Sequence, residues 1–205
     1  MAKTTQSISD ELKARLHSLE FTRKKVEQLS ATGLITRRDI EQIYKGLFLE
    51  SVAALESSIE DLFLGLLIGQ ITPRSTRTTS KIILSSRLAA QQIVFAGKFY
   101  DWLPYDRTTE RAEHFFKNGH PFSILNNGDK AKTEEFRLIR NAIAHKSHHA
   151  RKQFEDKVIG STALTPRERK VGGYLVGSFR SSPRQTRYEN LIIDMALIFE
   201  KVCMA

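Results

Sequence analysis

Three side chains in the second half of the chain combine the chemistry needed to cleave RNA. Arg140 and Asn141 are adjacent, and His145 follows four positions after Asn141. A histidine titrates near neutrality and can move a proton to or from a ribose 2′-hydroxyl. An arginine is always charged, forks onto phosphate oxygens and stabilises charge that develops on a phosphorus transition state. The set permits attack of the 2′-hydroxyl on the adjacent phosphate without a metal, with Asn141 orienting the histidine or holding a phosphate oxygen.

A regular helix would not bring all three of these side chains to one face. On a regular helix, five positions turn about 140°, so Arg140 and His145 do not share a face. Asn141 and His145, at i and i+4, do share one. Either the helix is irregular here or the site is completed by a second chain. The structural alternative is an Arg–His pair with no chemical role, because this spacing alone has little specificity.

Positive charge is concentrated around and after this motif. The net charge is +9, and residues 137–190 hold twelve Lys or Arg against four Asp or Glu, a net of +8. Such a surface favours a polyanion through counterion release. A solvated basic face is the alternative. The candidate substrate-binding residues follow the motif directly, although plain surface histidines and a solvated helix end are equally open: Lys146, His148, His149, Arg151 and Lys152.

Composition excludes several classes of protein. Cys203 is the single cysteine of the 205 residues, which rules out an internal disulfide framework and a zinc site built from several thiolates. No cysteine lies near His148 and His149 and acidic neighbours are sparse, so we expect neither a metal nor another cofactor. The most apolar run, 62–71, is about half the length that a bilayer requires. We therefore expect a cytoplasmic protein that is not associated with membranes.

Apolar spacing is helical nearly throughout the chain. Helices are expected over 7–29, 37–69, 80–98, 107–117, from a cap at Asp129 or Thr133 to about Lys146, and over 184–204. The segment 147–182 is the least regular, and its VGGYLVGSF run suggests a short hairpin or an ordered loop. The prediction is a single all-α domain, a bundle of about five to six helices. It comprises an extra N-terminal helix (1–35), core helices with the motif (37–147), a basic irregular segment (148–183) and a C-terminal helix (184–205).

The motif and its context resemble a known family. The run 138–145, LIRNAIAH, closely resembles the signature of HEPN domains, in which an arginine and a polar residue precede a histidine by four to six positions. The helix FLESVAALESSIEDLFLGLL resembles the early helix of that fold, particularly its RiboL-PSP-like branch. The resemblance covers about Ile40 to His149. The extra N-terminal helix and the basic, glycine-containing segment depart from a minimal HEPN domain.

The resemblance implies a function and residue roles. HEPN proteins are helical bundles that usually dimerise, so that two motifs face each other across a cleft, and many are metal-independent endoribonucleases. His145 would be the acid/base, Arg140 the phosphate ligand and Asn141 the polar helper, with Glu56 or Glu50 supporting the motif. A homodimeric hydrolase that cleaves RNA is therefore expected, acting as a toxin or antiviral defence effector with an antitoxin or defence-system protein as a possible partner. The alternative is a noncatalytic module that binds nucleotide or nucleic acid, or a structural adaptor in a defence complex.

Overall fold

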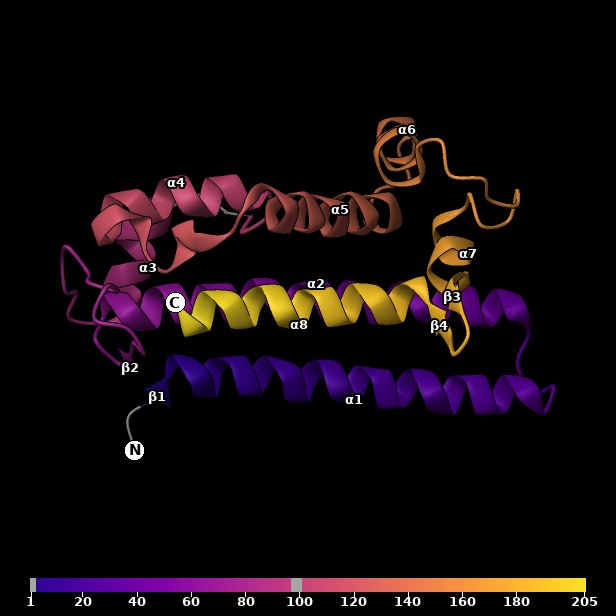
Figure 1. The fold of residues 1–205 in the computed structure, drawn as a ribbon, viewed down its shortest axis with the longest axis horizontal. Coiled ribbons are helices and arrows are strands. Elements are labelled where there is room, and N and C mark those ends of the chain that lie inside the picture. Colours follow the sequence, from indigo (N-terminus) through magenta and orange to yellow (C-terminus); the bar gives the residue numbers. More distant parts are fainter. Residues whose placement is uncertain (1–2, 97–100) are drawn as a thin grey trace. The chain divides into compact units, whose positions relative to one another are not determined.

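A computed structural model of the chain describes residues 3–96 and 101–205, and these residues are mainly helical (Figure 1). The all-α class is therefore confirmed. The described residues hold eight α-helices, two more than the upper expectation, because two short helices, α6 and α7, lie in the segment expected to be irregular. The helices are α1 (Thr5–Ala31), α2 (Arg37–Leu67), α3 (Arg87–Phe95), α4 (Tyr105–Phe115), α5 (Asn127–Ala144), α6 (His148–Phe154), α7 (Val171–Val176) and α8 (Arg187–Met204).

The remaining elements are short. Two 3-10 turns, η1 (Lys117–Gly119) and η2 (Phe122–Ile124), follow α4, and a π-helical turn, η3 (Glu155–Ile159), extends α6. Strand β1 (Lys3–Thr4) pairs in parallel with β2 (Ile71–Thr72). Strands β3 (Ser178–Ser181) and β4 (Arg184–Thr186) form an antiparallel hairpin immediately before α8. None of the helices in 3–96 and 101–205 is both long and apolar enough to cross a membrane.

Reciprocal caps set the starts of three long helices. At α2, the backbone N–H of Thr36 donates to Asp39 Oδ2 (2.9 Å) and that of Asp39 donates back to Thr36 Oγ1 (3.3 Å). At α5, the cap is Asn126, whose side chain accepts from the N–H of Asp129 (2.9 Å). The expected cap at Asp129 or Thr133 is therefore wrong, and the helix begins at Asn127. Thr186 caps α8.

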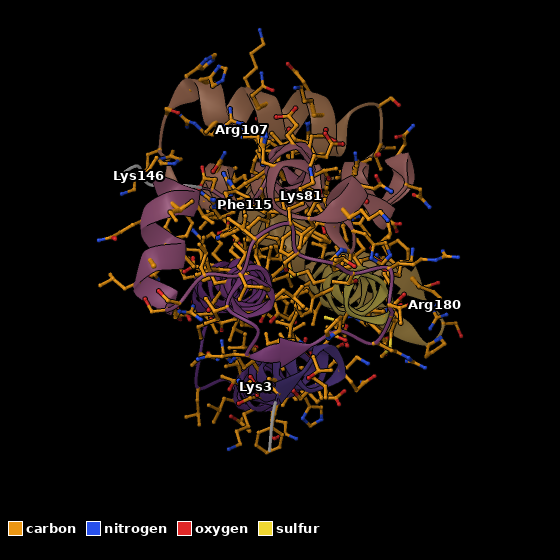
Figure 2. The ribbon with its side chains drawn as sticks, turned by 90° about the vertical axis from the view of Figure 1, so that its left-hand side faces the viewer. Lys3, Lys81, Arg107, Phe115, Lys146 and Arg180 are labelled. Carbon is orange, nitrogen blue, oxygen red and sulfur yellow. The ribbon has the colours of Figure 1, made fainter. Side chains whose placement is uncertain are left out.

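Two expected helices begin later than predicted. Residues 80–86 are not helical because their backbone bonds to distant segments: the N–H of Lys81 donates to the carbonyl of Phe115 (2.8 Å), and Figure 2 shows these two residues next to each other. The Ser86 side chain then caps α3 at Arg87. The expected end at 98 lies outside the described residues. Helix α8 begins at Arg187 rather than Arg184 because residues 184–186 form β4. Within the VGGYLVGSF run, expected to be a short hairpin or an ordered loop, VGGYLV forms α7, and Ser178 and Phe179 belong to the hairpin strand β3.

The described chain divides into two compact units, each with its own core. Unit 1 comprises 3–13, 54–96, 101–134 and 195–205. Its core contains the ring of Phe63, which contacts Phe122 (4.9 Å between centroids), Phe116 (5.0 Å) and Trp102 (5.2 Å). Four buried residues of α2 belong to this unit and form one apolar stripe, because they recur at intervals of three and four: Leu55, Ile59, Leu62 and Leu66.

Unit 2 comprises 14–53 and 135–194, and it contains the Arg-Asn-His motif. Tyr44 of α2 and Tyr188 of α8 meet edge to face, with ring centroids 5.3 Å apart. Arg23 of α1 is buried beside them and donates to the hydroxyl of Tyr44 (3.1 Å) and to Glu189 of α8 (2.8 Å). Three helices are thereby joined through one guanidinium. The candidate site therefore belongs to a unit whose interior contains a hydrogen-bonded polar network.

Candidate active site

Helix α5 positions the start of the motif. Phe136 and Ile139 are fully buried in it, which fixes the rotation of the helix. Arg140 and Asn141, the next two residues, are half-buried, and His145 is exposed just beyond the last helical residue, Ala144. Because the apolar face of α5 is buried, the polar motif lies at the solvent-accessible end of the helix.

The helix ends one residue before His145. The N–H of His145 still donates to the carbonyl of Asn141 (2.9 Å), but residues 145–147 are not helical. Ser147 is extended (φ −74°, ψ 149°), and its hydroxyl accepts from the N–H of Ala150 (3.2 Å), capping α6. The expected helix end at Lys146 is two residues too late. The chain is therefore irregular directly after the helical part of the motif, which is one of the two alternatives that the Arg140–His145 spacing left open.

A small pocket lies where α5 gives way to α6. Its volume is about 250 Å³. From α5 and the residue after it, the pocket is lined by Arg137, Leu138, Asn141 and His145. From the α6 side, it is lined by Ser147, His149, Ala150 and Gln153. This volume lies below the range of sites that enclose a whole small molecule, so the pocket fits one part of a longer ligand.

The structure brings together three of the predicted site residues and separates others. Asn141, His145 and His149 line the pocket. Arg140 is half-buried and is not among the residues that line it in the described part of the chain. Five other predicted site residues are exposed and also do not line the pocket: Lys146, His148, Arg151, Lys152 and Glu50, the last of which lies on α2 in unit 2. Glu56 belongs to unit 1.

Sequence reasoning missed Arg137, Ser147 and Gln153 as pocket residues. A signal for Arg137 was present, because Arg137, Asn141 and His145 recur at intervals of four and so form one stripe on the helix. Gln153 follows His149 by the same interval on α6. Ser147 carried no signal of its own, because its role depends on the break between the helices.

The pocket is lined by side chains of the types that exchange protons and attract anions. Two imidazoles, of His145 and His149, can act as base and acid, and the Arg137 guanidinium supplies positive charge. In residues 3–96 and 101–205, no group of three or more His, Cys, Asp or Glu side chains is arranged to hold a metal ion.

No family model matches the chain, and neither the curated proteins nor the solved structures contain a significant match to it.

Proposed function

We propose that the chain is an endoribonuclease of HEPN type that cleaves RNA without a metal. The observation that carries the proposal is the convergence of His145, His149, Asn141 and Arg137 on one pocket in a strongly basic unit. This set supplies the two proton-transfer groups and the positive charge that transesterification of RNA requires. The HEPN-like run LIRNAIAH contributes two of these four residues, Asn141 and His145.

The proposed reaction is an internal displacement at phosphorus. One histidine, His145, takes the proton of the 2′-hydroxyl as its oxygen bonds to the adjacent phosphorus. The bond from phosphorus to the 5′-oxygen breaks, and His149 gives a proton to that oxygen. The products are a 2′,3′-cyclic phosphate and a 5′-hydroxyl end. Arg137 or Arg140 neutralises charge on the non-bridging oxygens, and Asn141 orients His145.

The resemblance extends the proposal to assembly and biological role. A homodimer would place two motifs across one cleft, and Arg140, which does not line the pocket of its own chain, would then serve the composite site. Glu50 or Glu56 would support that arrangement. The proposed role is a toxin or an antiviral defence effector in the cytoplasm, restrained by an antitoxin or activated by another defence-system protein.

The test is cleavage of total cellular RNA by the purified protein in EDTA, with the ends mapped. We expect discrete cuts that end in 2′,3′-cyclic phosphate and disappear in His145→Ala. The matched control is His148→Ala, since His148 is an exposed histidine three positions away that does not line the pocket. If His149 is the acid, His149→Ala slows cleavage by about 100-fold or more, the usual contribution of a general acid.

Two arginine variants separate the geometric assignment from the family-based one. Arg137→Gln impairs cleavage most if one chain's pocket is complete, whereas Arg140→Gln does so if the site is shared between two chains. Intact RNA with both wild-type protein and His145→Ala would overturn the nuclease proposal. Retained RNA affinity in that case would favour the noncatalytic binding module.

A further inference from the structure

A second basic groove lies in unit 2, away from the residues of the motif. Its volume is about 600 Å³, and it is formed between the start of α2 and the segment 166–172 that leads into α7. Arg38 and Lys45 line it from α2, and Arg167 and Lys170 line it from the opposing segment. Glu41 is the one acidic residue in its lining. The groove therefore carries four cations against one carboxylate, and none of these residues belongs to the proposed catalytic set.

Most of this charge is available to a ligand. The Glu41 carboxylate is bonded to Arg167, with 2.5 Å between Oε1 and Nε. Within the part of the chain that the structure describes, no carboxylate lies within ion-pair distance of Arg38, Lys45 or Lys170, although the charge of Arg38 also interacts with the neighbouring Asp39 carboxylate. Arg38 and Lys170 are exposed and Lys45 is half-buried. Unpaired cations in a concave surface attract anions more strongly than the same cations on a convex one, because the walls focus the field.

The spacing of the cations suits a chain of phosphates. Arg38 and Lys45 are seven residues apart, two helical turns, so they lie on one face of α2 with an axial separation of about 10 Å. A single phosphate cannot contact both ends of such a row. Successive phosphodiesters of a single strand can, each next to its own cation. Heavy positive charge along a groove is the typical arrangement for tracking a nucleic-acid backbone.

The opposite wall is held close to α2 by a glycine. A Cβ atom at Gly172 would lie 3.0 Å from the Cβ of Glu41 and 3.2 Å from its carbonyl oxygen. The missing side chain therefore allows the segment 166–172 to approach α2. Because of this close approach, Lys170 lines the groove opposite Arg38 and Lys45.

We propose that this groove binds the sugar–phosphate backbone of single-stranded RNA and is an extended substrate subsite. The inference rests on the proposed function, which it deepens by naming a second contact region for the same RNA. Arg38, Lys45 and Lys170 neutralise phosphates, and Glu41 restrains Arg167. The groove supplies affinity without reading bases, since phosphate contacts carry no sequence information directly.

The test measures binding in a His145→Ala background, where cleavage cannot consume the probe. A fluorescein-labelled single-stranded RNA of about 20 nucleotides is titrated by anisotropy over a range of salt concentrations. Each phosphate contact contributes about 0.7 to the slope of log affinity against log salt for single strands. Arg38→Gln/Lys170→Gln should therefore reduce that slope by about 1.4 and weaken binding about 25-fold near 0.1 M salt.

The matched control, Arg15→Gln/Arg107→Gln, removes the same charge at two exposed positions outside the groove. We expect it to change affinity by less than about threefold, because neither side chain lines the groove. Circular dichroism confirms that each variant is folded. Equal effects of the two double variants, or no measurable RNA binding by the parent protein at low salt, would overturn the subsite.

A variant that makes the groove more positive tests the proposed role of Glu41 in restraining Arg167. Glu41→Gln frees Arg167 for a phosphate and should strengthen binding about fivefold near 0.1 M salt, the effect of one added contact. Glu110→Gln, an exposed acid on α4, is its control and should have little effect. These measurements read binding alone. Failure of the nuclease proposal, seen as RNA left intact by the wild-type protein in EDTA, is thus distinguishable from failure of the subsite.

Discussion

Arg23 on α1 is the most informative position for testing how unit 2 is held together. Its side chain is 4% exposed. It donates to Glu20 (2.7 Å from Nε), to Glu189 (2.8 Å) and to the hydroxyl of Tyr44 (3.1 Å), and it forms an ion pair with Glu27 (2.7 Å). Burial by itself would lower the pKa of Arg23, but the hydrogen bonds to Glu20 and Tyr44 outweigh it and raise the pKa above its ordinary value.

The structure sets the expected cost of removing this guanidinium. Arg23→Met keeps an apolar stem but leaves three carboxylates without their cation. Removal of one partner from a buried charge pair costs about 3–5 kcal/mol. The side chains of Glu20, Glu27 and Glu189 remain 20%, 41% and 23% exposed, so water compensates part of the loss. We therefore expect the free energy of unfolding to fall by about 3 kcal/mol, the lower end of that range.

Urea unfolding measures the effect, and the neighbouring residue provides the control. Lys24 is 62% exposed and lies 4.0 Å from the same Glu20, so Lys24→Met should cost less than about 1 kcal/mol. In a double-mutant cycle of Arg23→Met with Glu189→Gln, the changes in the free energy of unfolding should not add, because Arg23 and Glu189 contact each other. If Arg23→Met and Lys24→Met have the same midpoint and slope, the buried network contributes no stability and the reasoning is refuted.

Three further predictions concern other parts of the molecule. Burial, followed by the charge of Glu200, raises the pKa of the Cys203 thiol to about 12, whereas an unfolded cysteine titrates near 8.5. The unfolded state then binds fewer protons, so the free energy of unfolding should fall by up to about 1.4 kcal/mol per pH unit above pH 8.5, and Cys203→Ala should postpone that fall. Iodoacetamide should label Cys203, 0% exposed, only as fast as the chain unfolds. Ser147→Ala removes the cap of α6 and should destabilise it by about 1 kcal/mol, read as faster amide exchange, whereas Ser161→Ala should not.

Local patterns predicted the long helices because their signals lie within single turns. The stripe that includes Val52 and Leu62 recurs at intervals of three and four, and both residues are fully buried in α2. The capping box at the start of that helix is equally local, because Thr36 and Asp39 are only three residues apart. The start of α5 was misplaced because Asn126 and Asp129 are both good cap residues at neighbouring positions, and only the hydrogen bond shows which of them is used.

Non-local pairing explains the larger errors. Residues 80–86 have helix-compatible types, yet the N–H of Lys81 bonds to Phe115, which is over thirty positions away. No periodicity within the segment can reveal that partner. At 184–186 the partner is near in sequence, because Arg184 pairs across a hairpin with Ser181 instead of continuing α8 towards its N-terminus, but periodicity within the segment does not show it either. Tertiary hydrogen bonding outweighs helix propensity, which is worth only tenths of a kcal/mol per residue.

The candidate site lies between these two cases. The stripe of Arg137, Asn141 and His145 is local and could be read from the sequence, but it gains a second wall only because the chain breaks at Ser147. A helix continued through 149 would place His149 four positions beyond His145 on the same stripe, leaving no concave surface between them. The break converts a row of side chains into a lined pocket. Ser147→Ala, which removes the α6 cap, should therefore loosen the wall that holds His149 and weaken the pocket's function even with both histidines intact, which would separate the geometry of the site from its composition.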